Sequence, residues 1–208
     1  MSLESIVILL ADMSLLTEHQ VSEYVTWLSR SELHRYAKFS RLLRRQQFLL
    51  GRILLRYALG RSLNHHPRQI CLQERAGKGP ALVSPRSHRT GFSISHTRHW
   101  VACAVSLNSP VGLDIEYLDP NRDFVSLGEQ AFGFEAAAKL KALGQENCMQ
   151  LFYTMWCKYE ADIKLGSSSS HHQSLIWNDL AVGISSTADF APIQKCELIS
   201  LTELSNVK

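Results

Sequence analysis

The chain has 208 residues, of which 45% are apolar and 20% charged, and its formal net charge is +3. This length suits one domain or two small ones, and the composition excludes a disordered chain, a collagen-like fibre and a disulfide scaffold. The charge is divided unevenly. Residues 1–108 carry 15 basic and 6 acidic side chains, whereas residues 109–208 carry 7 basic and 13 acidic ones. A basic half joined to an acidic half indicates an anionic group held beside a cationic one.

The first apolar run, residues 6–11, predicts a buried strand. It is much shorter than the roughly 20 residues that span a bilayer, and no basic residue precedes it, so we expect neither a membrane anchor nor a signal peptide. The cysteines are odd in number and have no C-x-x-C spacing. They therefore predict reduced thiols in a cytoplasmic protein and disfavour a zinc site. These cysteines are Cys71, Cys103, Cys148, Cys157 and Cys196.

Helices are predicted next along the first half. Thr17 opens a capping box, and Ser31 is positioned to cap a second short helix. The strongest helix signal covers 41–59, where leucines such as Leu42 and Leu43 gather on one face and Gly60 provides a C-terminal stop.

The other face of this long helix carries a stripe of arginines. Nine basic residues and one acidic residue, Glu32, lie between Arg30 and Arg61. The stripe is interpreted as a solvated face, as a surface for nucleic-acid phosphates, or as a site for a compact phosphorylated ligand. No known nucleic-acid motif accompanies it, and a compact ligand needs fewer charges. The stripe consists of Arg41, Arg45, Arg52 and Arg56, with Arg44 beside it.

The first half is predicted to end in strands at 69–74, 92–95 and 101–106, with a Gly- and Pro-rich turn at 76–80. The second half follows a break at Asn108-Ser109-Pro110. It is expected to hold a strand at 111–117, helices at 134–143 and 148–164, a polar loop at 167–172, and strands at 175–184 and 193–201. Because each half runs strand, helices, strands, the sequence predicts an α+β fold of two halves, 1–108 and 109–208.

The strand at 111–117 carries a pair of carboxylates. Asp114 and Glu116 are two residues apart and therefore point to the same face. Two adjacent carboxylates repel each other unless protons or a cation lie between them, and oxygen-only ligands suit Mg²⁺. The alternative is a solvated acidic face on a half-exposed strand.

The helix at 148–164 offers a third carboxylate. Glu160 and Lys164 are separated by four residues and share a face with Tyr153 and Trp156. A surface Glu–Lys pair is the simple interpretation. The aromatic neighbours favour partial burial, in which case Glu160 could join the carboxylate pair and Lys164 could bind phosphate.

The strand at 92–95 ends in Ser95-His96. A histidine at this position could contact a phosphate, and the turn that follows offers backbone N–H groups to an anion. The alternative is a histidine with ordinary structural partners at a strand end.

Taken together in this order, the motifs resemble the 4′-phosphopantetheinyl transferases, specifically the monomeric, pseudo-duplicated type that activates surfactin synthetase. The resemblance covers about residues 30–166 and implies an α+β fold of two similar halves with pseudo-twofold symmetry. It is carried by Gly77-Lys78-Gly79-Pro80, Ser93-Ile94-Ser95-His96, Gly112-Leu113-Asp114-Ile115-Glu116, and Trp156-Cys157-Lys158-Tyr159-Glu160-Ala161-Asp162-Ile163-Lys164.

The resemblance implies a Mg²⁺-dependent enzyme, a holo-[acyl-carrier-protein] synthase. It would transfer the phosphopantetheine arm of coenzyme A to a serine of an apo acyl or peptidyl carrier protein and release adenosine 3′,5′-bisphosphate. Asp114, Glu116 and Glu160 would hold the Mg²⁺. Glu160 would take the proton from the carrier serine, and Lys164 would neutralise charge on the pyrophosphate.

The resemblance also implies that the basic half binds coenzyme A and that the acidic half supplies the metal ligands. The coenzyme-binding residues would be Arg35, Arg45, Lys78, Ser95 and His96. An acidic carrier would dock on the segment 118–134, and no nucleic acid or membrane would be needed.

This sequence departs from the family pattern in three places. Tyr159 stands where a lysine often precedes the catalytic Glu, and Lys158 is one residue too early, which rotates it by about 100° on a helix. Gly79 is inserted in the Gly-Lys-Pro turn, and a Ser- and His-rich loop follows Lys164. These departures motivate one alternative, a relative that binds coenzyme A or a carrier without transfer. A nucleic-acid-binding domain is a further alternative, which leaves the three carboxylates unexplained.

Overall fold

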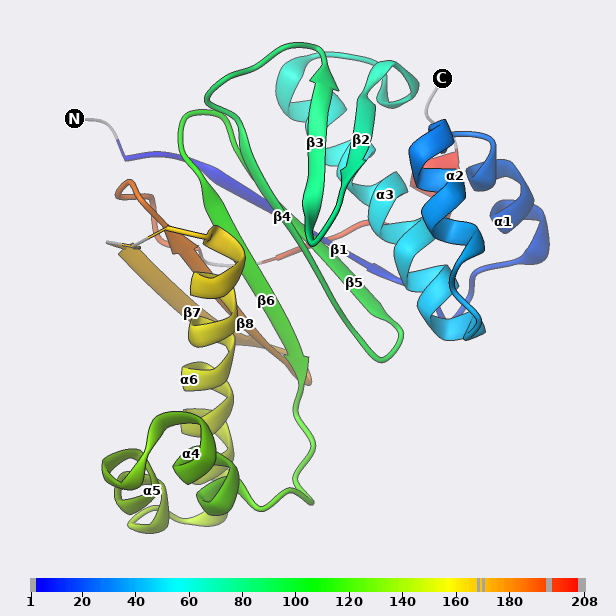
Figure 1. The fold of residues 1–208 in the computed structure, drawn as a ribbon. Helices are drawn as coiled ribbons and strands as arrows, with labels where there is room; N and C mark the ends of the chain where they lie inside the picture. The colour runs from blue at the N-terminus through cyan, green and yellow to red at the C-terminus, as the bar shows by residue number, and fades with distance from the viewer. Residues whose placement is uncertain (1–2, 168, 170, 194–195, 206–208) are drawn as a thin grey trace.

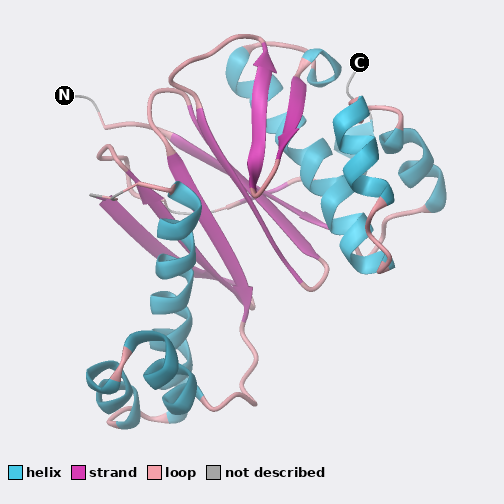
Figure 2. Ribbon diagram, in the orientation of Figure 1, coloured by secondary structure: helices cyan, strands magenta, loops and turns pink. Residues whose placement is uncertain are grey.

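The structure, a computed structural model, describes residues 3–167, 169, 171–193 and 196–205. Helices and strands are both spread along the chain, and the strands form mainly antiparallel sheets, which confirms the predicted α+β fold (Figures 1 and 2). Within these described residues, no helix is both long enough and apolar enough to span a bilayer.

The first half contributes three strands to a sheet in the order β4-β5-β1-β9, whose edge strand β9 comes from the C-terminal part of the chain and pairs parallel with β1. The helix α3 (Leu42–Leu63) packs on one face of this sheet, and its leucines join the strands in the largest apolar core. The predicted strands at 6–11, 92–95 and 101–106 are confirmed. The sheet consists of β1 (Ile6–Asp12), β4 (Gly91–Thr97), β5 (Trp100–Ser106) and the short β9 (Glu197–Leu198).

Two short helices, α1 (Glu18–Val25) and α2 (Arg30–Ala37), precede α3, and each begins with a capping box. Thr17 caps α1 as predicted. The predicted cap of the second helix, Ser31, is wrong. Ser29 is the cap, because its hydroxyl accepts from the Glu32 backbone N–H while the Glu32 carboxylate accepts from the Ser29 N–H.

A 3₁₀ turn, η1 (Pro67–Gln69), leads into the hairpin of β2 (Cys71–Arg75) and β3 (Lys78–Ser84). The turn predicted at 76–80 is therefore shorter than expected, since Lys78 already begins β3. Only Gly77 in the turn adopts a positive φ, of 67°.

The second half is built on a sheet in the order β6-β8-β7, covered by α6 (Gln145–Leu165). The strand predicted at 175–184 is instead a hairpin that turns at Asn178, whose φ is 50°. The segment predicted as a strand at 193–201 contains β9 and the start of a helix, and its residues 194–195 lie outside the described residues. The elements are β6 (Val111–Tyr117), β7 (His171–Trp177), β8 (Leu180–Ser186), α4 (Phe124–Phe132), α5 (Phe134–Lys141) and α7 (Leu201–Ser205).

The helix α6 lies unusually close to β6 and β8. A Cβ atom on Gly112 would meet the carbonyl oxygen of Ala161 at 1.9 Å, and one on Gly183 would meet the backbone of Cys157 at 2.5 Å. These two glycines have no side chain to separate helix from sheet. Because Asp114 and Glu116 share the face of Gly112, they point toward α6.

The two halves meet where β4 lies beside β6 (Figure 1). In each half the first strand pairs with the second strand of a later hairpin, as β1 pairs with β5 and β6 pairs with β8. The two sheets therefore share one connectivity, although the pseudo-twofold symmetry itself stays a prediction.

Candidate active site

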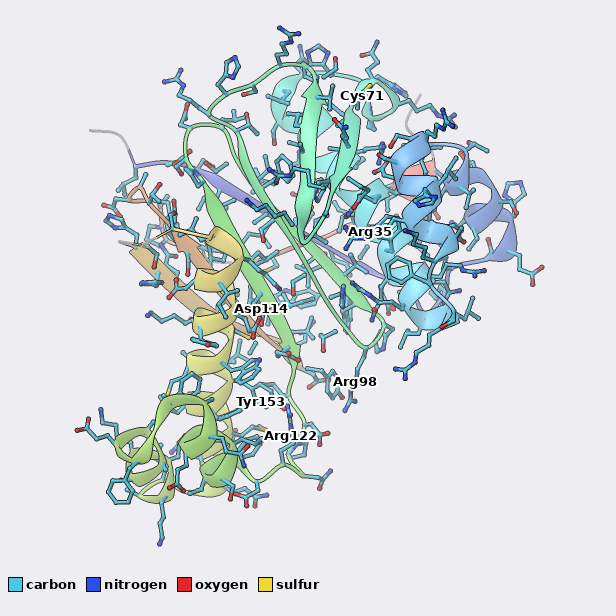
Figure 3. The ribbon with its side chains drawn as sticks, in the orientation of Figure 1. Arg35, Cys71, Arg98, Asp114, Arg122 and Tyr153 are labelled. Atoms are coloured by element: carbon cyan, nitrogen blue, oxygen red, sulfur yellow. The ribbon has the colours of Figure 1, made fainter. Side chains whose placement is uncertain are left out.

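Asp114 is at the centre of the site, on β6 and facing α6 (Figure 3). Its side chain is buried, with a residue exposure of 4%. Oδ1 accepts from Lys164 Nζ at 2.6 Å and from the Ser95 hydroxyl at 2.9 Å, and Lys164 also donates to Ser95 Oγ at 2.8 Å. Three predicted site residues from three separate elements are thereby joined in one hydrogen-bonded cluster.

Glu116 lies two residues further along β6. Its carboxylate accepts from the Thr97 hydroxyl at 3.2 Å. Burial is the main cause that raises the pKa of Glu116, and the negative charge of Asp114 raises it further. The two carboxylates are therefore close enough to repel each other, as the sequence predicts.

Glu160 is partly buried and makes no side-chain hydrogen bond or ion pair with any residue the structure describes. It lies one helical turn before Lys164 on α6. No group of three or more His, Cys, Asp or Glu side chains among the described residues is arranged as a metal cluster.

The carboxylates nevertheless fit a hard divalent cation. Oδ2 of Asp114 is buried and has no hydrogen-bond partner among the described residues. An ionised oxygen without a partner is costly in a buried position, and the neighbouring charge on Glu116 adds to the cost. A cation bound by carboxylate oxygens would satisfy both groups.

A pocket of about 1160 Å³ opens beside this cluster. Its wall includes residues of α2, α3, the β2–β3 hairpin, β4 and the C-terminal turn of α6, and no carboxylate lines it. Such a cavity attracts anions. The cationic side chains that line it are Arg35, Arg44, Arg52, Arg75, Lys78, Arg89 and Lys164.

Three of the five predicted coenzyme-binding residues line this pocket. Arg35, Lys78 and His96 line it, whereas Ser95 is buried behind the wall. Arg45 is not among the lining residues. Its guanidinium donates twice to the carbonyl oxygen of Phe39, at 2.9 and 3.2 Å.

Four of the arginines that line the pocket, Arg44, Arg52, Arg75 and Arg89, are not among the predicted coenzyme-binding residues. Arg44 contacts the Nε2 atom of His96 directly. Burial, and then the charges of Arg44 and Lys164, lower the pKa of His96 to about 4. For Arg89 the sequence offers one signal: the basic segment Arg86-Ser87-His88-Arg89 lies just before the strand that carries Ser95.

Two arginines of the α3 stripe, Arg52 and Arg56, do not lie on a solvated face. Arg56 is 2% exposed and forms a bidentate pair with the fully buried Glu32, at 3.0 and 2.5 Å. Arg52 lies between Glu32, at 3.6 Å, and Glu74, at 2.7 Å. Glu74 in turn holds Arg35 at 2.5 Å. The chain of ion pairs thus holds Arg35 in place at the pocket.

The apolar face predicted for this helix is wrong at its first turn, because Leu42 and Leu43 are exposed. Arg52 and Arg56 of the stripe are buried, since carboxylates from α2 and β2 neutralise them, whereas Arg41 is exposed. Single-helix periodicity does not contain this information.

The unusual residues near Glu160 lie away from the pocket. Tyr159 is 47% exposed and packs edge-on against Phe132. Lys158 pairs with Asp162 at 3.6 Å and does not line the pocket. Neither side chain takes the position of Lys164.

All five cysteines are free, and only Cys71 is exposed, which confirms the predicted thiols.

The chain is similar over part of its length to known 4′-phosphopantetheinyl transferases. A family profile described as 4′-phosphopantetheinyl transferase, N-terminal, matches residues 16–108. The transferase HetI of Nostoc sp. is 31% identical over 149 residues, which are 71% of this chain and 62% of that protein. The transferase gsp of Aneurinibacillus migulanus is 34% identical over 116 residues, 56% of this chain and 46% of that protein.

A third relative, the transferase AcpT of Salmonella typhi, is 28% identical over 160 residues, 76% of this chain and 74% of that protein. The chain thus covers less than two thirds of HetI and of gsp. The profile and the relatives thus agree, and together they support the 4′-phosphopantetheinyl transferase superfamily.

Proposed function

We propose that this protein transfers the 4′-phosphopantetheine arm of coenzyme A to a serine of an apo acyl or peptidyl carrier protein, with Mg²⁺, and releases adenosine 3′,5′-bisphosphate. One observation carries the proposal: a cationic pocket ends at Lys164, and Lys164 is bonded to a buried carboxylate with one unpaired oxygen.

The pocket suits the phosphates of coenzyme A. Arg35 and Lys78 supply positive charge from α2 and from the β2–β3 hairpin, and His96 adds a ring nitrogen from β4. Arginine and lysine together bind phosphate well, the first by its planar fork and the second as a point charge. Arg45 would act from outside the lining, on the adenine side.

The residues that would hold Mg²⁺ are Asp114, Glu116 and Glu160. When bound, the ion would neutralise the pyrophosphate and make the bisphosphate a better leaving group. Asp114 and Glu116 are already adjacent on β6. Glu160 is free of protein partners in the described chain, so its carboxylate is available.

Glu160 is also the proposed base. It would accept the proton of the carrier serine while that oxygen attacks the β-phosphate of coenzyme A. Lys164, held by Asp114 and Ser95, would present its ammonium to the pyrophosphate as negative charge develops there. Ser95 would act mainly by orienting this lysine.

The proposal assigns residues 1–108 to coenzyme binding and residues 109–208 to the metal ligands, in two halves with pseudo-twofold symmetry. The protein would act as a cytoplasmic monomer. An acidic carrier would dock on the segment 118–134, which contains α4, at the N-terminal end of α6 (Figure 1).

The alternative is a relative that binds coenzyme A or a carrier without transferring the arm. Tyr159 favours it, because this position often carries lysine in the family. Coenzyme A binding that is indifferent to Mg²⁺ in calorimetry would support the alternative.

Intact-mass measurement tests the proposal. The purified protein is mixed with coenzyme A, Mg²⁺ and a panel of apo carriers, beside a transferase of proven activity. We expect at least one carrier to gain the mass of one phosphopantetheine arm. No gain on any carrier that the control enzyme loads would reject the transfer.

A further inference from the structure

The seam between the halves has an unusual hydrogen-bond arrangement. The strands β4 and β6 lie side by side, but they belong to different sheets: in the described chain β4 pairs with β5 and β6 pairs with β8. The backbone N–H groups of β6 that face β4 therefore need partners other than a strand ladder.

Ser95 provides one such partner. Its hydroxyl oxygen accepts from the backbone N–H of Ile115 at 3.2 Å, and its proton is donated to Oδ1 of Asp114 at 2.9 Å. One side chain thus holds a strand edge and a carboxylate together.

Thr97 repeats this arrangement two residues further along β4. Its hydroxyl oxygen accepts from the N–H of Tyr117 at 3.3 Å and donates to Oε2 of Glu116 at 3.2 Å. Both hydroxyls bind a β6 carboxylate and the N–H of the residue after it. The repeat matches the two-residue period of the strands.

The orientation of Glu116 depends on this second hydroxyl. A threonine hydroxyl has one proton, so the bond to Oε2 uses its whole donor capacity. Among the described residues, Thr97 is the side chain that hydrogen-bonds Glu116. Thr97 itself does not line the cationic pocket, so it has no direct place among the coenzyme contacts.

We propose that Thr97 is a positioning residue for Glu116: its hydroxyl holds that carboxylate beside Asp114 so that both present oxygens to a divalent cation. The inference rests on the proposed function, in which Glu116 is a metal ligand. Groups that orient a ligand in this way raise metal affinity by about 10- to 100-fold.

The test compares Thr97→Val with the wild type. Mn²⁺ serves as the probe, titrated calorimetrically into the protein with coenzyme A present. We expect Mn²⁺ binding about tenfold weaker in Thr97→Val. The Mg²⁺ concentration for half-maximal transfer should rise by a similar factor, with kcat at saturating Mg²⁺ close to the wild-type value. Thr97→Ser keeps the hydroxyl and should restore both.

A purely structural role predicts a different pattern. Loss of the Tyr117 contact alone would lower the melting temperature and weaken coenzyme A binding in EDTA, whereas a positioning role leaves metal-free coenzyme A binding unchanged. Thr97→Ala is a second variant without the hydroxyl, should the valine not fold. Thr26→Val is the matched control, because the Thr26 hydroxyl donates a hydrogen bond to the Glu23 carbonyl oxygen in α1.

Wild-type Mn²⁺ affinity in the folded hydroxyl-free variants would overturn the inference, as would a Thr97→Ser protein as impaired as Thr97→Val. These outcomes are separable from failure of the proposed function. A wild-type protein that neither binds Mn²⁺ nor loads a carrier overturns both, whereas an active wild type with an unaffected Thr97→Val overturns only the role of Thr97.

Discussion

Lys164 and Asp114 are 50 residues apart in the chain, and their charged atoms lie 2.6 Å apart. Asp114 is nearly inaccessible, whereas the lysine side chain is 29% exposed and lines the cationic pocket. The lysine therefore supplies the counter-charge that a buried carboxylate requires and still reaches the ligand space. This one contact connects the carboxylate pair of β6 to the pocket.

Replacing Lys164 should impair both stability and transfer. Lys164→Met leaves Asp114 buried without its cation, and we expect the free energy of unfolding to fall by about 1–3 kcal/mol, less than for a fully buried pair because the lysine is partly exposed. Carrier loading should fall by at least about 100-fold. Urea unfolding and an intact-mass assay measure the two effects.

Lys158→Met is the matched control, because Lys158 lies on the same helix and forms an exposed pair with Asp162. Such pairs contribute about 0.3–0.5 kcal/mol. Equal losses in the two variants would contradict the role given to the Lys164–Asp114 contact.

Unlike Lys164, Glu160 should affect the rate of transfer without affecting the stability of the fold. The carboxylate has no partner among the described residues, so Glu160→Gln should change the free energy of unfolding by no more than about 0.5 kcal/mol. Loss of a general base should slow transfer by about 10²–10⁴-fold. Glu146→Gln, an exposed position in the first turn of α6, should be active. A fully active Glu160→Gln protein would refute the assignment.

Breaking the buried ion-pair network beneath the pocket should lower the free energy of unfolding far more than Glu160→Gln does. Glu32 is fully buried between Arg52 and Arg56, so Glu32→Gln leaves the buried Arg56 without a neutralising charge, whereas Arg52 keeps its pair with Glu74. We expect destabilisation of about 3–5 kcal/mol by urea unfolding. The exposed pair of Arg61 and Glu197 offers the control. Glu197→Gln should change stability by no more than about 1 kcal/mol, and a similar value for Glu32→Gln would disprove the prediction.

The sequence predicted the parts of the fold that depend on local pattern. Hydrophobic periodicity and capping chemistry located β1, α1 and α3, and the two-residue period of β6 placed Asp114 and Glu116 on one face. The i, i+4 spacing correctly joined Glu160 and Lys164 to one side of α6. Each of these inferences needs only the geometry of one element.

The remainder depended on contacts between distant elements. The burial of Arg52 and Arg56 follows from carboxylates on α2 and β2, which no pattern within α3 reveals. The hairpin at Asn178 was missed because the apolar alternation continues through a two-residue turn. The pocket role of Arg89 follows from the position of β4 beside the pocket.

His96 should remain neutral well below neutral pH. Burial, Arg44 and Lys164 hold its folded-state pKa at about 4, below the ordinary value of 6.5. The unfolded chain therefore binds a proton at higher pH than the native protein does. Above pH 6.5 His96 is neutral in both states and the free energy of unfolding is at its full value. As the pH falls from 6.5 toward 4, the unfolded chain takes up the proton first, so the free energy of unfolding decreases. A histidine NMR titration measures it directly. A midpoint near 6.5 in the folded protein would contradict the contact with Arg44.

The close approach of α6 to β6 should be as important for stability and carrier loading as the charged side chains of the site. A Cβ atom on Gly112 would lie 1.9 Å from the Ala161 carbonyl oxygen and 2.8 Å from the Leu165 nitrogen, so Gly112→Ala must push the helix away from the strand. Overpacking of this kind costs about 1–3 kcal/mol or more, and the shift also moves Lys164 away from Asp114. We therefore expect lower stability together with weaker coenzyme A binding and slower loading. Gly144→Ser, at the open N-cap of the same helix, should fold and load carriers like the wild type. Normal stability and loading in Gly112→Ala would show that α6 does not need this contact with the sheet.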